Sequence, residues 1–312
     1  MSQVLAVISD LVGMISTRIT HQITPLLLLL LATLLSSCGD NMERGQVSLS
    51  SEMGGGDLQS YRLLWNNSSS SSGGPALNVK ISSSFLAEEQ QIANSMMEEW
   101  NNSHAELKFF NTDQIEISDN LELSDVTAYK DNELGIYKSQ QWFENVSPAA
   151  LAITQFFGIR RDVGTIAERV ELIHADIIVN YRYFDFSTTN DSNNNNYGNG
   201  SYDLASVLLH ELGHFLGLAH QSDFYSESIM HPYMSSYDVE QATYPQDRDD
   251  LQTNYDIENT LLKSNALMVA ALPAGDKKQD KNINSESDQL VYGIFELQSS
   301  GKCQHRIKIY PL

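Results

Sequence analysis

The sequence predicts an α+β fold, because strand-like and helix-like patterns both occur along the chain. Residues 174–186, HADIIVNYRYFDF, are rich in β-branched and aromatic residues in alternation, which is typical of a strand. Residues 86–102, LAEEQQIANSMMEEWNN, place their apolar side chains near one helical face, and residues 203–217 repeat that spacing. We therefore expect two long helices, the second capped at its N-terminus by Asp203.

The remaining elements are shorter. Further strands are predicted at residues 76–82, 106–111, 133–138 and 150–159. Residues 187–203 are polar and Asn-rich, which indicates a surface loop; its oxygens could bind Ca²⁺, but a solvated loop is the simpler interpretation. A last helix is expected over 246–262, and two strand-like runs around a central SSGK predict a hairpin at the C-terminus.

Charge and cysteine content exclude several classes of protein. The 312 residues include 40 acidic and 19 basic ones, for a net charge of −21. Binding to nucleic acid, or electrostatic docking on anionic lipid, is therefore not expected; a soluble exported protein is. Two cysteines, Cys38 and Cys303, are too few for a disulfide-stapled fold or a cysteine zinc site. Cys303 is interpreted as an incidental free thiol.

The N-terminal residues predict export. The apolar run from Pro25 to Leu35 is too short to span a bilayer as a helix, which takes about 20 residues, but it suits a signal peptide. The Ser-Ser-Cys that ends at Cys38 resembles the lipobox of bacterial lipoproteins. That resemblance implies lipidation of Cys38 and a place in the bacterial cell envelope, at the outer membrane or cell surface since Gly39 is not aspartate. The alternative is an ordinary signal peptide cut nearby. Because the first 13 residues carry no basic residue, we predict translation from Met14.

The chain divides into four predicted parts. Residues 1–38 form the signal peptide, and the Gly/Ser-rich residues 39–75 form a flexible tether. LQSYRLLW, at 58–65, is an exception that either packs on the following domain or belongs to a small pro-segment. The patterned residues 76–262 form the main domain, and 263–312 form a linker and the hairpin-like extension.

The stretch HELGHFLGLAH, residues 210–220, predicts a metal site. His210 and His214 lie one helical turn apart, so both imidazoles can reach one zinc ion at about 2.0–2.1 Å. Glycine at Gly217 permits a left-handed turn that returns His220 as third ligand, leaving a fourth position for water. Glu211 can then accept a proton from that water. Histidines that only pack in a core are disfavoured, because burying three imidazoles and a carboxylate without a common partner is costly.

This stretch resembles the zinc-binding motif HExxHxxGxxH of the metzincins. In SIMHPYM, Met230 corresponds to the family's turn methionine, which implies a hydrophobic supporting role beneath the ligands. SVLLHELGHFLGLAH, SIMHPYM and QDRDDLQTNY resemble matrixin segments in the same order, and Pro232 stands where astacins and serralysins have tyrosine. The resemblance covers roughly 76–262. It implies a metzincin catalytic domain: a twisted mixed sheet packed on the first long helix and the active-site helix, with a small C-terminal subdomain.

The sequence also departs from the matrixin pattern. Gln221 follows the third histidine, where matrixins usually have serine. No cysteine lies between Cys38 and His210, so latency through a propeptide thiolate is not expected. The His- and Asp-rich loop of a second, structural zinc is missing from 184–203, so we predict one zinc ion and not two.

We therefore predict a zinc-dependent endopeptidase that hydrolyses extracellular or periplasmic proteins. Glu211 is its general base and later protonates the leaving amine. The resemblance implies that substrate binds along a sheet edge, expected within 177–202, and that the loop 231–245 shapes specificity. The membrane is reached through the lipid anchor only, and a monomer is expected. Two alternatives remain: a non-catalytic, zinc-stabilised surface lipoprotein (adhesive or a degenerate protease), against which the intact Glu211 argues, and a zinc hydrolase acting on non-peptide bonds.

Overall fold

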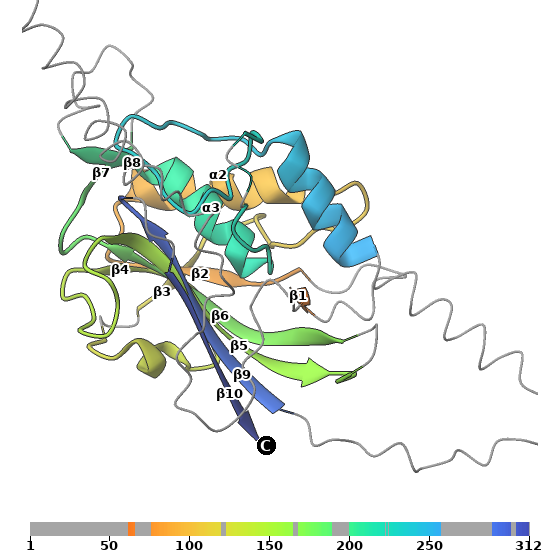
Figure 1. Cartoon of the computed structure of the whole chain (residues 1–312). Coiled ribbons are helices and arrows are strands. Elements are labelled where there is room, and N and C mark those ends of the chain that lie inside the picture. Colours follow the sequence, from red (N-terminus) through yellow and green to blue (C-terminus); the bar gives the residue numbers. More distant parts are fainter. Residues whose placement is uncertain are drawn as a thin grey trace, which may run out of the picture. The chain divides into compact units, whose positions relative to one another are not determined.

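A mixed β-sheet of eight strands forms the centre of the computed structural model (Figure 1). The strands run in the order β10-β9-β5-β6-β4-β2-β3, and β1 pairs with β6 beside that path. Pairs β10–β9, β9–β5 and β5–β6 are antiparallel and the others are parallel, so the predicted mixed α+β architecture is confirmed. The strand bounds are β1 Arg62–Trp65, β2 Val79–Ser82, β3 Glu116–Ser118, β4 Leu134–Ser139, β5 Ala150–Arg161, β6 Arg169–Asn180, β9 Gln289–Gln298 and β10 Gln304–Pro311.

The structure describes nine stretches of the chain. They are residues 62–65, 76–119, 123–164, 168–188, 200–221, 223, 225–256, 289–300 and 304–311. The predicted signal peptide and lipidation site, Met14, Cys303 and most of the proposed calcium loop lie outside them.

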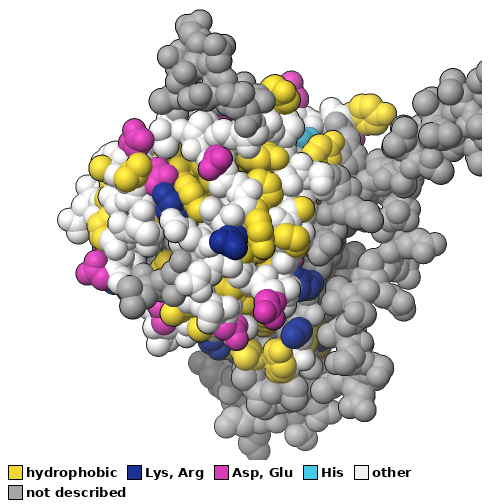
Figure 2. Space-filling model, turned by 90° about the vertical axis from the view of Figure 1, so that its left-hand side faces the viewer, with side chains coloured by type: hydrophobic (Ala, Val, Ile, Leu, Met, Phe, Trp, Pro, Cys, Tyr) yellow, Lys and Arg dark blue, Asp and Glu magenta, His cyan; other side chains and the backbone are white. Residues whose placement is uncertain are grey.

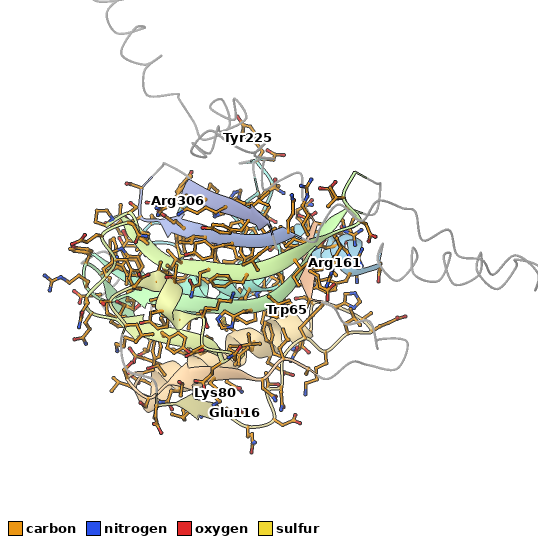
Figure 3. The ribbon with its side chains drawn as sticks, turned by 90° about the horizontal axis from the view of Figure 1, so that it is seen from below. Trp65, Lys80, Glu116, Arg161, Tyr225 and Arg306 are labelled. Carbon is orange, nitrogen blue, oxygen red and sulfur yellow. The ribbon has the colours of Figure 1, made fainter. Side chains whose placement is uncertain are left out.

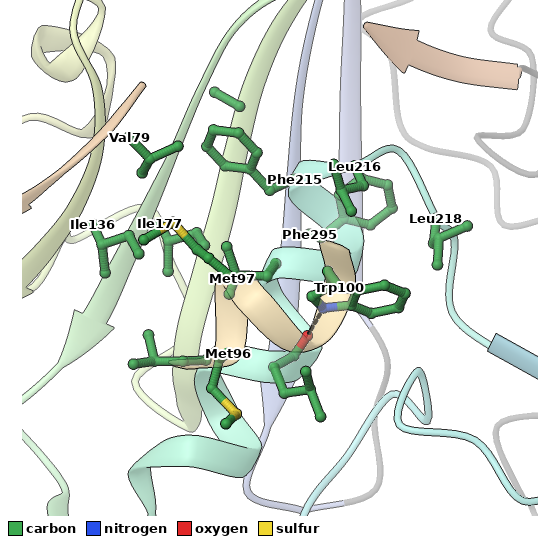
Figure 4. Packing of buried hydrophobic residues seen from close by; sticks show 14 of the residues in the cluster. Val79, Met96, Met97, Trp100, Ile136, Ile177, Phe215, Leu216, Leu218 and Phe295 are labelled. Carbon is green, nitrogen blue, oxygen red and sulfur yellow. Dashed lines mark hydrogen bonds between the residues drawn. The ribbon is translucent and has the colours of Figure 1, made fainter. Parts of the chain in front are cut away.

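Two helices cover one face of the sheet, as predicted. Helix α2 (Ala87–Asn101) packs on α3 (Leu204–Phe215), and Trp100 of α2 donates its indole N–H to the Leu209 carbonyl at 2.8 Å (Figure 4). Every residue of α3 is buried, because α2, the sheet and the chain that follows α3 surround it. A final helix begins at residue 245 and is described as far as residue 256.

A second hydrophobic cluster fills the opposite face of the sheet. It includes Trp142, Phe143 and Val146, which pack beneath the inner residues of β5 and β6. A short 3-10 helix, η2 (Val126–Tyr129), closes this side. The sheet is thus buried on both faces through its centre, which accounts for the long apolar runs of β5 and β6.

Strand β1 is the described part of the apolar patch at 58–65, and it packs on the domain. Its four residues pair in parallel with the start of β6, and Trp65 stacks on Phe215 with the ring centroids 5.5 Å apart. The Trp65 indole N–H donates to the Phe215 carbonyl at 2.8 Å, so it satisfies a carbonyl at the C-terminal end of α3. β1 and the β9–β10 hairpin therefore add to the sheet two segments from outside the range 76–262.

Two predicted strands differ from the structure. Residues 106–111 form only an isolated bridge, between Phe110 and Leu77, because Asn101 takes the place of a neighbouring strand: its side chain accepts from the Phe109 and Phe110 N–H groups and donates to the Phe110 carbonyl. The strand predicted over 174–186 ends at Asn180, whose side chain accepts from the N–H groups of the next turn.

Beyond that turn, β7 (Asp185–Ser187) pairs with β8 (Ser201–Asp203) in a separate, two-stranded parallel sheet.

On the face shown in Figure 2, basic side chains are scattered singly among hydrophobic and acidic ones. Within the described stretches, no helix has the length and hydrophobicity needed to cross a bilayer.

Candidate metal centre and active site

Helix α3 sets the position of the motif histidines. Its N-terminal cap is Asp203, whose carboxylate accepts from the Ser206 N–H at 2.9 Å, as the sequence predicts. The helix ends before Gly217, which has φ +92°, the left-handed conformation expected there. The chain then turns back, and His220 comes to lie beside His214.

The three motif histidines form a compact cluster. Their ring centroids lie 4.5 to 5.4 Å apart, and one ligand nitrogen from each falls within 4.8 Å of the others. In a tetrahedral zinc site the nitrogens lie about 3.3 Å from one another. The structure thus brings together His210, His214 and His220 in a spacing that a single ion can bridge.

Hydrogen bonds at Nδ1 orient Nε2 of each helical histidine as its metal-binding nitrogen. The Nδ1–H of His210 donates to the Ile229 carbonyl at 2.7 Å, and that of His214 donates to the Leu218 carbonyl at 2.7 Å. Because a carbonyl can only accept, each Nε2 carries a lone pair. The Nε2 of His210 is buried without a hydrogen-bond partner, and the Nε2 of His214 lies 3.0 Å from that of His220.

This donor set fits a divalent cation with a preference for imidazole, such as zinc. The buried Nε2 lone pair of His210, which has no hydrogen-bond partner, is costly unless a cation accepts it. Burial lowers the pKa of His210 to about 4, which keeps its imidazole in the neutral form that binds metal.

Glu211 lies beside the cluster and faces the sheet. Its Oε2 is 2.5 Å from the Thr154 hydroxyl of β5, and its Oε1 is buried without a hydrogen-bond partner. Burial raises the pKa of Glu211 to about 8, opposed by the Thr154 hydroxyl and by the Leu297 backbone N–H. A cation at the histidines would favour the carboxylate and lower this pKa. The group is therefore placed to exchange a proton next to the histidine cluster.

Met230 packs against the helix between the two helical histidines. A Cβ at Gly213 would overlap its sulfur and crowd Trp100, so glycine at this position of the motif allows methionine and helix to meet. Met230 is buried, and its carbonyl accepts from the Gln221 N–H at 2.8 Å. The Met230 side chain thus packs against α3 at Gly213, between the two helical histidines in the sequence.

The turn that carries Met230 is held by a residue that the sequence did not single out. Asp247 is fully buried and accepts hydrogen bonds from the Ser228 hydroxyl and the Ile229 and Tyr244 N–H groups. Since the Ile229 carbonyl orients His210, Asp247 supports the metal cluster indirectly.

The sheet edge expected within 177–202 was placed wrongly. Residues 177–180 belong to β6, which is paired on both sides, with β4 and with β5. The strand next to the site is β5, through Thr154, and its outer side is paired with β9. Sequence periodicity could not show this, because it identifies strands but not their neighbours.

A comparison with family models supports the same class of site. Residues 138–256 match the model described as Matrixin, a family of zinc-dependent peptidases. The matched stretch holds the three histidines, Glu211 and Met230. A search of curated proteins and a search of solved structures returned no match. Together, this match and the mixed sheet define a matrixin-like metzincin catalytic domain, the class that the motif predicted.

Proposed function

We propose that the chain is a zinc-dependent endopeptidase. The observation that carries the proposal is the convergence of three buried imidazole nitrogens beside Glu211. His210, His214 and His220 would hold the zinc ion, and Met230 would support them from below. Bound there, zinc would polarise the scissile carbonyl and lower the pKa of water.

The chain's own residues supply binding and proton transfer. When β9 does not occupy the outer side of β5, the backbone of β5 pairs with the extended substrate, and this positions the scissile bond beside the histidines. Glu211 accepts a proton from the attacking water and then delivers it to the leaving amine. The Thr154 hydroxyl orients the Glu211 carboxyl for both transfers.

The direct test compares zinc binding with hydrolysis. The chain should bind one equivalent of zinc and hydrolyse casein, and a chelator should abolish the activity. Glu211→Ala should keep the zinc and lose the hydrolysis, whereas Glu106→Ala, the same change at an exposed glutamate, should keep both. Hydrolysis by a zinc-loaded Glu211→Ala chain would contradict the assignment, and two zinc equivalents would contradict the single site.

The same assay separates the alternatives. A non-catalytic lipoprotein would bind zinc without hydrolysing any substrate, and a hydrolase of another class would cleave esters but not casein.

The proposed location is the bacterial cell envelope, by lipidation at Cys38, with extracellular or periplasmic proteins as substrates. The lipobox-like residues before Cys38 support it. Cys38→Ser should move the protein from the membrane fraction to the soluble one, and an unchanged distribution would contradict the anchor.

A further inference from the structure

We propose that the C-terminal hairpin β9–β10 makes the enzyme latent, because β9 fills the substrate-binding cleft. The inference rests on the proposed peptidase function and adds a mode of regulation to it. It stands on four observations: the pairing of β9 with β5, its contacts with the chain after Met230, its position over the histidines, and an ion pair within the hairpin whose carboxylate is buried.

The first observation is that β9 uses the backbone groups that a substrate would need. It pairs with β5 in antiparallel fashion along nearly its whole length, from Ala150 opposite Gln298 to Arg160 opposite Gln289. Without the hairpin, β5 would be the free edge of the sheet next to Glu211. Since extended peptides bind by adding a strand to such an edge, β9 and a substrate exclude each other.

The second observation is that the end of β9 is held from its other side as well. The Gln298 N–H donates to the Pro232 carbonyl at 3.2 Å, and the Met234 N–H donates to the Gln298 carbonyl at 3.0 Å. This pairing is parallel and is centred on Tyr233. The segment around Leu297 therefore lies between two backbone walls, β5 and residues 232–234, which together form a cleft for one extended strand.

The third observation is that β9 crosses the catalytic groups. The ring of Phe295 stacks on His214 with centroids 4.1 Å apart and planes within 4°, and it meets His220 edge-on. Two residues later, Leu297 pairs with Ala152 of β5, the strand whose Thr154 hydroxyl contacts the Glu211 carboxyl. A substrate carbonyl cannot approach the histidines while Phe295 and Leu297 occupy these positions.

The fourth observation explains why the segment is a hairpin and not one strand. Glu296 points to the opposite face of β9, where its carboxylate is fully buried and paired with Arg306 of β10. The Arg306 side chain is labelled in Figure 3. The other Glu296 oxygen accepts from the Gln298 side chain at 2.9 Å. Without Arg306 the docked hairpin would bury an uncompensated charge, whereas a released hairpin would expose Glu296 to water. The ion pair therefore stabilises the docked state selectively.

The test uses charge reversal in the full, zinc-loaded chain. Arg306→Glu should release the hairpin and raise casein hydrolysis by about tenfold or more over the parent chain, because a buried unpaired charge is strongly unfavourable. Combining it with Glu296→Arg restores an opposite-charge pair and should return activity toward the latent level. Arg182→Glu, the same change at an exposed arginine, should leave activity as in the parent.

A binding measurement gives a readout that does not need catalysis. In a Glu211→Ala background, a labelled peptide of residues 289–300 should bind the Arg306→Glu chain and bind neither the parent nor the charge-swapped chain. Equal hydrolysis by all three chains, or equal peptide binding to all three, would overturn the proposal. So would self-cleavage of β9 seen in the intact mass, because β9 would then be a substrate and not an inhibitor.

Failure of the proposed function would look different. If no chain hydrolyses casein although each binds zinc, the peptidase function fails, and peptide binding alone decides whether β9 occupies the cleft. Should Arg306→Glu lose its near-ultraviolet circular dichroism, Phe295→Ala takes its place in both measurements, because it removes the stack on His214 without adding a charge. Its hydrolysis and peptide binding are then compared with the parent by the same criteria.

Discussion

Replacement of Asp247 with alanine should weaken both the fold and zinc binding. The change leaves the N–H groups of Ile229 and Tyr244 buried without their acceptor, and each such loss costs about 1–3 kcal/mol. The loss of the Ser228 contact adds to this, so we expect the free energy of unfolding to fall by about 3–5 kcal/mol in total, or about 10 °C in Tm. Because the freed turn carries the carbonyl that orients His210, zinc affinity should fall by about 10- to 100-fold.

Thermal unfolding of the metal-free chain measures the first effect, and competition for zinc with a chelating dye measures the second. Asp249→Ala is the matched control, since that aspartate is exposed on the same helix. If Asp247→Ala matches Asp249→Ala in both Tm and zinc affinity, the supporting role of the buried carboxylate is refuted.

Three further predictions follow from single contacts. Thr154→Val removes the hydroxyl beside Glu211 and should lower kcat about tenfold at unchanged zinc affinity; an unchanged kcat would show that the hydroxyl orients nothing. Gly217→Ala should destabilise the chain by about 2–4 kcal/mol in denaturant unfolding, because its Cβ would overlap the β1 backbone. Gly164 also has a positive φ but lies in open space, so Gly164→Ala should cost only about 1–2 kcal/mol. Burial lowers the pKa of His104, whose Nδ1 accepts from two backbone N–H groups, so its contribution to stability is present above pH 6.5 and is lost as the pH falls below that value. His104→Asn should therefore reduce the loss of stability between pH 7 and 5.5, and an equal loss in both chains would count against this.

Local patterns predicted the helices and the metal cluster well. The apolar residues of 86–102 and of 203–217 fall on one face only if each segment is a helix. The spacing of the motif then places three histidines and a glutamate on a single helix and the turn after it. Both depend on neighbours within a few residues. Asp203 as the helix cap and the left-handed Gly217 belong to the same local class, and the structure has both.

Contacts between residues far apart in the sequence could not be predicted from these local patterns. Thr154 meets Glu211, and Asp247 meets the turn at Ser228, only once the sheet and the last helix are packed. The hairpin at the C-terminus was predicted as an element, but nothing in its alternation indicates that β5 is its partner. At residues 106–111 a strand was predicted that the structure does not have. There the Asn101 side-chain amide accepts the backbone hydrogen bonds that a neighbouring strand was expected to accept.

Strand β1 changes the distance at which an anchored domain would stand from a bilayer. If Cys38 carries lipid and a flexible tether follows it as predicted, that tether ends before Arg62, where pairing with β6 begins, and not at the start of β2. As a flexible coil, this shorter length spans about 25–30 Å. That is comparable to the diameter of a small domain, so the cleft beside β5 would remain within one domain width of the headgroups. Proteins held at or near the same surface would then meet the enzyme at a much higher local concentration than proteins free in the surrounding medium.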